Sequence, residues 1–372
     1  MKKGFIKIIS AILVVALLVC AVPASVFAQN SDFGEIQIGV MTDLHYYAQA
    51  NIDDKDKATE VCEKTISTSH LADSILRTAL NFYKKQAEQG KLDYLLLPGD
   101  LTKDSEYEAH TGLAEIFLEY EEKYGLQFIV TPGNHDINSP NASTFVNGKK
   151  EKGRPITADE FREVYAELGY DLAYEEYAEY YTEAYKGESN DVRNKLSYVV
   201  DLDDNYRLIV LDSNIYGFGT AETANTAGEL TEETMKWVKA LADDAKANGK
   251  TPMILLHHGL AAHMETEPSI TFAFPLNSYM EVAEQFASWG IHYAFSGHLH
   301  TDDIAATIND DGEVLYDCET ASVTGFPCTY REMTIRTFED GESEMDFLSV
   351  DFDESYEFTF DGKKKKKGTA KA

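Results

Sequence analysis

One pattern, repeated three times, constrains the fold of this chain more than any other feature. A short apolar run enters a glycine turn, and polar side chains follow at once. At residues 127–137 the run Phe-Ile-Val-Thr leads into Pro-Gly-Asn-His-Asp. Residues 95–100 and 293–300 repeat the plan, ending in Gly-Asp and Gly-His-Leu-His. Because ligands bind at the carboxyl ends of strands in open α/β sheets, the repetition predicts one site assembled from several strand ends.

Strand-like and helix-like segments alternate through the first part of the chain. Their β-α-β-α-β order predicts parallel strands with helices packed on the sheet. A second half, rich in strands, begins at Leu196 and ends in short strands over residues 304–350. The expected strands are 36–42, 93–97, 128–130, 197–202, 206–211, 253–256 and 292–296, and the expected helices are 70–89, 106–124, 231–247 and 278–288.

Two segments do not follow this alternation of strands and helices. Residues 138–195 are rich in Tyr, Glu and Ala, with a possible capping box at Thr157 and Glu160, and are predicted to be a helical insertion beside the site. Their tyrosines are expected to pack against the body, with stacking on a substrate as the alternative. Residues 351–372 contain a run of five lysines and are predicted to be a disordered basic tail.

The first 28 residues have the features of a secretory signal peptide. Three lysines precede an apolar run that is short for a membrane span, and Val26-Phe27-Ala28 fits a small-residue cleavage rule. Cys20 raises a lipoprotein interpretation, but Val19 before it is not the small residue that such processing prefers. We therefore expect a secreted or cell-envelope protein with no transmembrane domain once the signal is removed.

The charge of the chain restricts its partners. The formal net charge is -31, and removal of the signal segment with its three lysines makes it -34. Such an acidic surface argues against a nucleic-acid groove, which requires clustered positive charge. Cys318 and Cys328 could close a disulfide in an exported protein, and free thiols are the equal alternative.

The polar residues at the strand ends form a ligand set for metal ions. Two carboxylates, one amide and several imidazoles suit Zn²⁺, Mn²⁺ or Fe better than Ca²⁺. One ion would not use so many ligands, whereas two ions about 3.5–4 Å apart sharing a carboxylate would. The candidates are Asp43, His45, Asp100, Asn134, His135, His257, His298 and His300, which include half of the ten histidines.

These motifs, in this order, resemble those of the calcineurin-like metallophosphoesterases. The matching residues are Asp43-Leu44-His45, Gly99-Asp100, Gly133-Asn134-His135-Asp136, His257 and Gly297-His298-Leu299-His300. The resemblance implies a domain over residues 36–350 with an α/β, four-layer αββα sandwich of two mixed sheets flanked by helices. It also implies two metal ions, one held by Asp43, His45, Asp100 and His300, the other by Asp100, Asn134, His257 and His298.

The resemblance also implies a mechanism. A hydroxide bridging the two metals attacks phosphorus, and His135 protonates the leaving group or stabilises the transition state. Many members carry an aspartate three residues after the bridging one to pair with this histidine. Here Lys103 occupies that position, with Asp104 next to it, so the usual partner of His135 is absent there. Purple acid phosphatases place a tyrosine ligand at the same position, so Lys103 argues against that subgroup.

The expected function is hydrolysis of a small-molecule phosphate ester, with phosphodiesters favoured. A phosphomonoesterase of the nucleotidase kind shares the same metal core and is the first alternative. A non-catalytic surface binding protein on the same fold is the second, and the intact ligand set and His135 argue against it.

Overall fold

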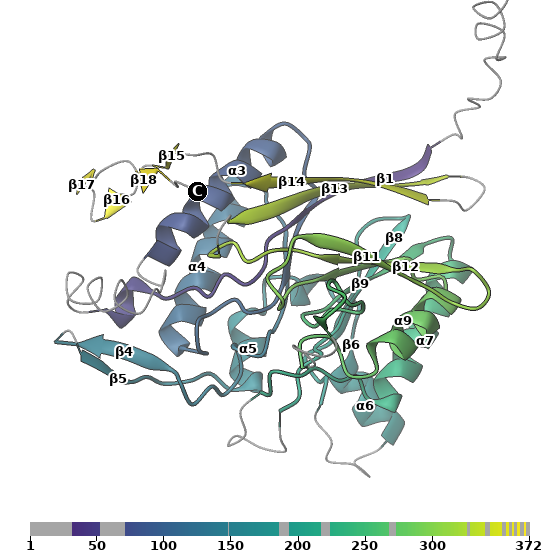
Figure 1. Ribbon diagram of the computed structural model, residues 1–372, viewed down its shortest axis with the longest axis horizontal. Helices are drawn as coiled ribbons and strands as arrows, with labels where there is room; N and C mark the ends of the chain where they lie inside the picture. The colour runs from purple at the N-terminus through teal and green to yellow at the C-terminus, as the bar shows by residue number, and fades with distance from the viewer. Residues whose placement is uncertain are drawn as a thin grey trace, which may run out of the picture.

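Figure 1 shows the computed structural model of the chain, which describes most of the residues but not all of them. Among the described residues, no helix combines the length and the apolar character that crossing a membrane requires. The predicted signal segment, with Cys20, and Cys62 lie outside the described residues. The described residues are 32–52, 71–147, 149–185, 193–216, 224–267, 273–325, 328–338, 343–351, 355–356, 359–360, 363–364 and 368–369.

The first of two large sheets has the strand order β14-β13-β1-β2-β3. Its β1, β2 and β3 pair in parallel, as the alternation of strands and helices predicted, and β13 joins β1 antiparallel. Parallel pairing brings the carboxyl ends of these three strands to one edge of the sheet. The bounds are β1 Asp32–Val40, β2 Tyr94–Pro98, β3 Phe128–Thr131, β13 Thr329–Phe338 and β14 Ser343–Asp351.

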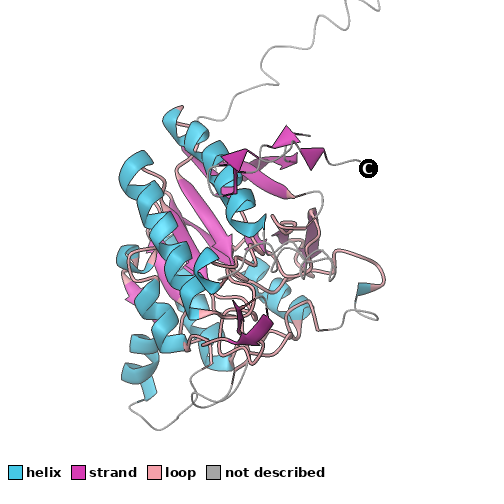
Figure 2. Cartoon of the chain, turned by 90° about the vertical axis from the view of Figure 1, so that its left-hand side faces the viewer, coloured by secondary structure: helices cyan, strands magenta, loops and turns pink. Residues whose placement is uncertain are grey.

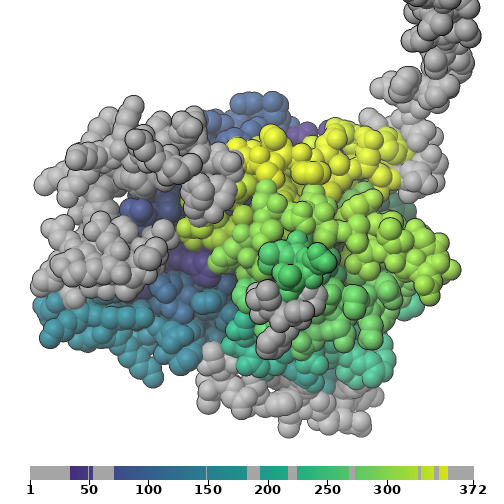
Figure 3. All heavy atoms as spheres, in the orientation of Figure 1, coloured from purple at the N-terminus to yellow at the C-terminus, as the bar shows by residue number. Residues whose placement is uncertain are grey.

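The second sheet has the order β11-β12-β10-β9-β8-β7-β6. Its four central strands, from β12 to β8, are parallel, and the outer strands are antiparallel. On the face seen in Figure 3, β13 and β14 of the first sheet lie next to β11 and β12. The bounds are β6 Glu175–Glu176, β7 Tyr198–Asp201, β8 Tyr206–Val210, β9 Thr251–Leu255, β10 Tyr293–Ser296, β11 Asp303–Ile308 and β12 Val314–Glu319.

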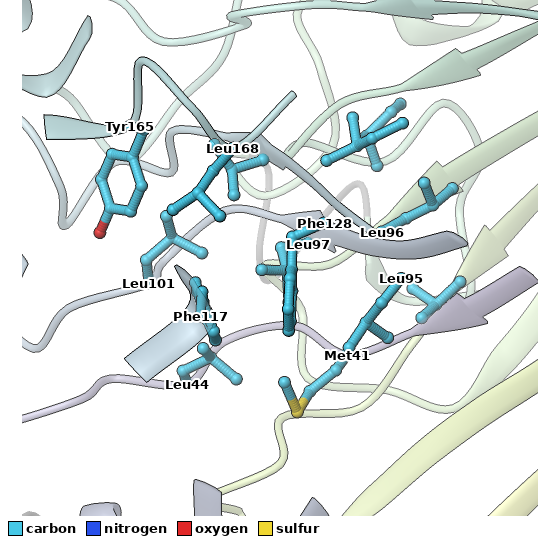
Figure 4. Packing of buried hydrophobic residues seen from close by; sticks show 14 of the residues in the cluster. Met41, Leu44, Leu95, Leu96, Leu97, Leu101, Phe117, Phe128, Tyr165 and Leu168 are labelled. Carbon is cyan, nitrogen blue, oxygen red and sulfur yellow. The ribbon is translucent and has the colours of Figure 1, made fainter. Parts of the chain in front are cut away.

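Helices cover the outer faces of the two sheets and complete the expected αββα arrangement (Figures 1 and 2). Helices α3 (Ala72–Glu88) and α4 (Tyr107–Tyr124) pack on the first sheet, where Phe117 of α4 stacks on Phe128 of β3 with ring centroids 4.5 Å apart (Figure 4). Helices α7 (Glu232–Ala247) and α9 (Tyr279–Ser288) pack on the second sheet. The mixed α/β fold predicted from the sequence is confirmed.

Tyrosine hydroxyls join the inner faces of the sheets. Tyr198 of β7 donates to the carbonyl of Val130 in β3 at 2.7 Å, and Tyr94 of β2 donates to the carbonyl of Leu202 at 2.6 Å. Apolar side chains from both sheets fill the space between them and form one continuous core. The sheets therefore hold their strand ends in a fixed relation, which is the requirement for a site shared between them.

The segment 138–195 is less helical than predicted. It contains α5 (Ala158–Val164), with the expected capping box at Thr157, and α6 (Tyr177–Tyr185). It also contains a hairpin of β4 (Ser143–Val146) and β5 (Lys149–Lys152), and β6 at the edge of the second sheet. The hairpin forms because Phe145 packs on Tyr47 and Ile52, residues too distant in sequence for local periodicity to reveal.

Two of the tyrosines in this segment pack against the body, as expected. Tyr170 is buried and donates to the carbonyl of Leu196 at 2.8 Å. Tyr177 is buried against Trp237 of α7, with ring centroids 5.2 Å apart. Tyr174 is less well covered, since about half of its surface is exposed. The hypothesis that these side chains stack on a substrate gains nothing from their positions.

The C-terminal segment and the cysteines were also the subject of predictions. The tail expected to be disordered contains two short ladders, β15 (Ser355–Tyr356) with β18 (Gly368–Thr369) and β16 (Thr359–Phe360) with β17 (Lys363–Lys364). Cys318 and Cys328 are not joined to each other by a disulfide, so that alternative does not hold.

Candidate metal centre

Loops at the carboxyl ends of five strands converge between the two sheets. Asp43, Asp100 and Asn134 follow β1, β2 and β3 of the first sheet, and His257 and His298 follow β9 and β10 of the second. Main-chain hydrogen bonds join the first two loops, from the Asp43 nitrogen to the Gly99 oxygen at 3.2 Å. The structure brings together all eight residues that the sequence singled out.

The first group of possible ligands comprises Asp43, His45 and His300. The Nε2 atom of His300 lies 3.1 Å from Asp43 Oδ1 and 3.3 Å from the Nε2 of His45. The Oδ2 atom of Asp100 lies 3.9 Å from the same His45 nitrogen. These four side chains are the ones that the resemblance assigned to one metal ion.

The second group comprises Asp100, His257 and His298. The Nε2 atom of His257 lies 3.4 Å from Asp100 Oδ1 and 3.2 Å from Asn134 Oδ1. The carboxylate of Asp100 thus turns one oxygen toward each group. This is the arrangement that a shared, bridging ligand requires.

Three observations fit this pair of groups to metal ions. The Nε2 atom of His298 is buried with no hydrogen-bond partner among the described residues, although buried polar atoms normally have one. His257 contacts the carbonyl of Pro98 through Nδ1 at 2.7 Å, which leaves Nε2 free to bind a cation. The donor set of carboxylate, amide and imidazole is that of Zn²⁺, Mn²⁺ or Fe sites.

The backbone at this centre is held in an uncommon conformation. Five predicted ligands have positive φ angles, a region that residues other than glycine rarely adopt and that functional sites often retain. Glycine permits the close approach, because a Cβ on Gly133 would lie 2.2 Å from the Asp100 nitrogen. The five residues are Asp43 (51°), His45 (40°), Asp100 (47°), His298 (77°) and His300 (60°).

Burial and neighbouring charges set the protonation of the groups. Burial would raise the pKa of Asp43, but nearby imidazoles, His300 first, lower it to about 2. Burial also opposes ionisation of Asp100, yet His257 and His135 hold its pKa well below the ordinary value. Burial lowers the pKa of His298 to about 3. Ionised carboxylates and a neutral imidazole at neutral pH are the forms that bind metal ions.

His135 lies beside both groups. Its backbone nitrogen donates to Asp100 Oδ1 at 2.8 Å, and its ring meets that of His45 edge-on at 4.9 Å. Its Nδ1 donates to the Lys103 carbonyl at 2.7 Å and lies 3.4 Å from Asp104 Oδ1. Burial would lower the pKa of His135, but the carboxylates of Asp100 and Asp104 raise it to about 10. Position 103 offers no carboxylate, and Asp104 supplies the partner of His135.

Two further residues support the centre. Asp136, fully buried, accepts hydrogen bonds from the nitrogens of Leu101, Thr102 and Gly133 at 2.8–3.0 Å and so fastens two ligand loops together. The sequence motif contains Asp136 but does not indicate this role. His258 contacts Ser213 Oγ through Nδ1 and the Thr226 carbonyl through Nε2, so neither ring nitrogen is free for a metal.

The family model of the calcineurin-like phosphoesterases matches residues 36–302, which is most of the chain. The chain belongs to this family. No curated protein matches the sequence. Family membership carries with it metal-dependent hydrolysis of phosphate esters, and the two clustered ligand groups agree with that chemistry.

Solved structures with a similar arrangement are distant in sequence. A dimetal phosphatase from Danio rerio is 12% identical to this chain. The match covers 86% of this chain and 99% of the phosphatase, with a TM-score of 0.45. A phosphopantetheinyl hydrolase from Mycobacterium tuberculosis is 12% identical, and the match covers 77% of this chain and 90% of the hydrolase, with a TM-score of 0.35. A purple acid phosphatase from yellow lupin is 11% identical, and the match covers 86% of this chain and 54% of the lupin protein, with a TM-score of 0.41. The assignment of the chain to its family rests on the family model and not on these scores.

Proposed function

We propose that this protein is an exported enzyme that hydrolyses small-molecule phosphate esters at a dinuclear metal centre, with phosphodiesters as the favoured class. The observation that carries the proposal is the position of Asp100, whose two carboxylate oxygens face two separate groups of histidine and aspartate ligands. The sequence of residues 1–28 supports export.

The residues that would hold the ions are those of the two groups. Asp43, His45 and His300 would hold one, Asn134, His257 and His298 would hold the other, and Asp100 would be shared. Bound divalent cations supply Lewis-acid charge that neutralises phosphoryl oxygens and makes water a stronger nucleophile at neutral pH. This charge also lets an anionic substrate approach a chain with a formal net charge of -31.

His135 is the candidate general acid for the leaving group. Its Nδ1 is engaged by the Lys103 carbonyl and the Asp104 carboxylate, which leaves Nε2 as the ring nitrogen for substrate. Both contacts favour the protonated imidazole, the form that can give a proton to a departing oxygen. His45 and Asp100 lie close enough for His135 to join them as a ligand instead, so its role requires a test.

One experiment tests the proposal against its alternatives. The purified protein is analysed for metal content and then assayed with a mono-aryl and a bis-aryl phosphate at equal concentration. We expect close to two Mn, Fe or Zn ions per chain and faster turnover of the diester. Faster turnover of the monoester would make the protein a phosphomonoesterase, and bound metal with no hydrolysis would favour a binding protein on the same fold.

A further inference from the structure

A buried polar cluster that the proposed reaction does not use lies behind the turn carrying His298 and His300. Ser296 ends β10, and Asp317 and Glu319 lie on the adjacent strand β12. At most 1% of each of these three residues is exposed. A buried group of this kind is costly unless its hydrogen bonds are complete, so the position of each hydrogen can be worked out.

The hydroxyl of Ser296 fixes the number of protons. Its Oγ lies 2.6 Å from Asp317 Oδ1 and 3.2 Å from Glu319 Oε2. A hydroxyl has a single hydrogen and can donate to only one of the two oxygens. If both carboxyls were ionised, the Ser296 hydroxyl would donate to one of them. An oxygen of the other carboxyl would then face Ser296 Oγ with no hydrogen between the two atoms. One of the two carboxyls must therefore be protonated and donate to Ser296.

Asp317 is the carboxyl that hydrogen-bond donors surround. Its Oδ2 accepts hydrogen bonds from the backbone nitrogens of Leu260 and Ala261 and faces His263 Nε2 at 3.3 Å. The other ring nitrogen of His263 lies 3.1 Å from Asp303 Oδ2. An imidazole between two carboxylates donates through both nitrogens and is positively charged. Several donors around one carboxylate favour its charged form.

Among the described residues, Glu319 faces fewer donors. Besides Ser296, its partner is the backbone nitrogen of Leu299, which donates to Oε1 at 2.9 Å. Burial raises the pKa of Glu319 well above its ordinary value, and the carboxylates of Asp317 and Asp43 act in the same direction. The hydrogen that the cluster requires therefore belongs on Glu319 Oε2.

We infer that Glu319 is held as the neutral acid and is a positioning residue for the turn that carries His298 and His300. Its Oε2–H donates to Ser296, and its Oε1 receives the nitrogen of Leu299, which lies between the two histidines. Both histidines have positive φ angles, 77° and 60°, which are uncommon outside glycine and persist only where surrounding contacts hold them. The bond to Leu299 is one of those contacts. The link to metal binding rests on the proposed function, whereas the location of the proton does not.

Amide substitutions distinguish the two carboxyls, because an amide resembles a protonated acid and not a carboxylate. In Glu319→Gln, the amide NH₂ can donate to Ser296 and its oxygen can accept from Leu299. In Asp317→Asn, the NH₂ group faces either the donors around Oδ2 or the hydroxyl of Ser296, so the variant loses at least one hydrogen bond that Asp317 accepts. The two positions lie on the same strand and are equally buried, which makes each the matched control of the other.

The first readout does not depend on activity. Infrared difference spectra of the metal-free protein should show the carbonyl band of a buried protonated carboxyl that disappears in Glu319→Gln and remains in Asp317→Asn. In urea, Glu319→Gln should unfold at the wild-type concentration, whereas Asp317→Asn should unfold at a lower one. A band that survives in Glu319→Gln, or equal loss of stability in both variants, would overturn the location of the proton.

The second readout tests positioning. Protein loaded with Mn²⁺ alone is mixed with excess EDTA, and the release of the ion is followed. Because groups that orient ligands typically contribute 10–100-fold in metal affinity, Glu319→Ala should release Mn²⁺ about tenfold faster than wild type. Glu319→Gln should stay within about twofold of the wild-type rate, since it keeps both hydrogen bonds. Equal rates for wild type and Glu319→Ala would overturn the positioning role. A wild-type protein that binds no Mn²⁺ would refute the proposed metal centre and leave the infrared result to stand separately.

Discussion

At the scale of single residues, Asp100 has the largest predicted effect on metal content. Its carboxylate oxygens lie near imidazole nitrogens of both ligand groups, whereas the Asp43 carboxylate meets an imidazole of the first group and the backbone nitrogen of His298 in the second. We expect Asp100→Asn to lose more metal than Asp43→Asn, because it weakens two sites at once. Metal analysis of both variants after the same purification measures the difference. Full occupancy in Asp100→Asn would show that the carboxylate does not bridge.

His135 separates proton transfer from metal binding. Since a general acid typically contributes about 10²–10⁴-fold, His135→Ala should lose rate in that range while keeping its metals. The loss should be smallest for a nitrophenolate leaving group, which needs little protonation, and largest for an alkoxide. Steady-state rates with paired substrates measure it. An equal loss on both would assign His135 to charge stabilisation, and loss of one metal would make it a ligand.

At the scale of elements, the ends of strands and helices were largely predictable, and the contacts between distant loops were not. Glycine in the left-handed conformation ends α4 at Gly125, and Thr231 caps α7, so both helices begin and end within about a residue of expectation. Three of the ligand turns were visible because each has its own glycine, at Gly99, Gly133 and Gly297. The partner of His135 was not, since Asp104 reaches it through a turn in which Ser105 has a φ of 68°, and tertiary contacts set that angle.

The junction between α4 and β3 gives a prediction on pH. Glu121 of α4 accepts the backbone nitrogen of Phe128, and burial raises its pKa from 4.5 to about 7. A carboxyl whose pKa is higher in the folded state favours folding when protonated. That contribution is complete below the unfolded pKa and is lost as the pH rises through about 7.

Glu121→Gln should therefore change the pH dependence of stability. The amide oxygen can still accept the hydrogen bond and cannot ionise, so the variant should gain stability relative to wild type as the pH rises from 5 to 8. Urea unfolding at both pH values measures this change. Glu122→Gln is the control on the same helix, and it should show no such trend. A variant less stable than wild type at pH 8 would contradict the argument.

At the scale of the whole molecule, the metal centre depends on the two sheets keeping a fixed position relative to each other. Asp43, Asp100 and Asn134 come from one sheet and His257 and His298 from the other, so relative movement of the sheets would separate the ligands. The hydroxyl of Tyr198 spans the interface to the Val130 carbonyl, four residues before Asn134. Tyr198→Phe removes this hydroxyl and leaves a buried carbonyl without its side-chain donor.

Losing one partner of a buried hydrogen bond costs about 1–3 kcal/mol, so Tyr198→Phe should lower the free energy of unfolding by that amount. Tyr174→Phe is the matched control, because Tyr174 is half exposed and its substitution should change stability little. If the sheets position the ligands, Tyr198→Phe should also release metal to a chelator faster than Tyr174→Phe under conditions where both are fully folded. Reduced stability with unchanged metal release would show that the loops hold the centre by their own contacts. In that case the hydrogen bonds of Asp136 and Glu319 would be the ones to remove next.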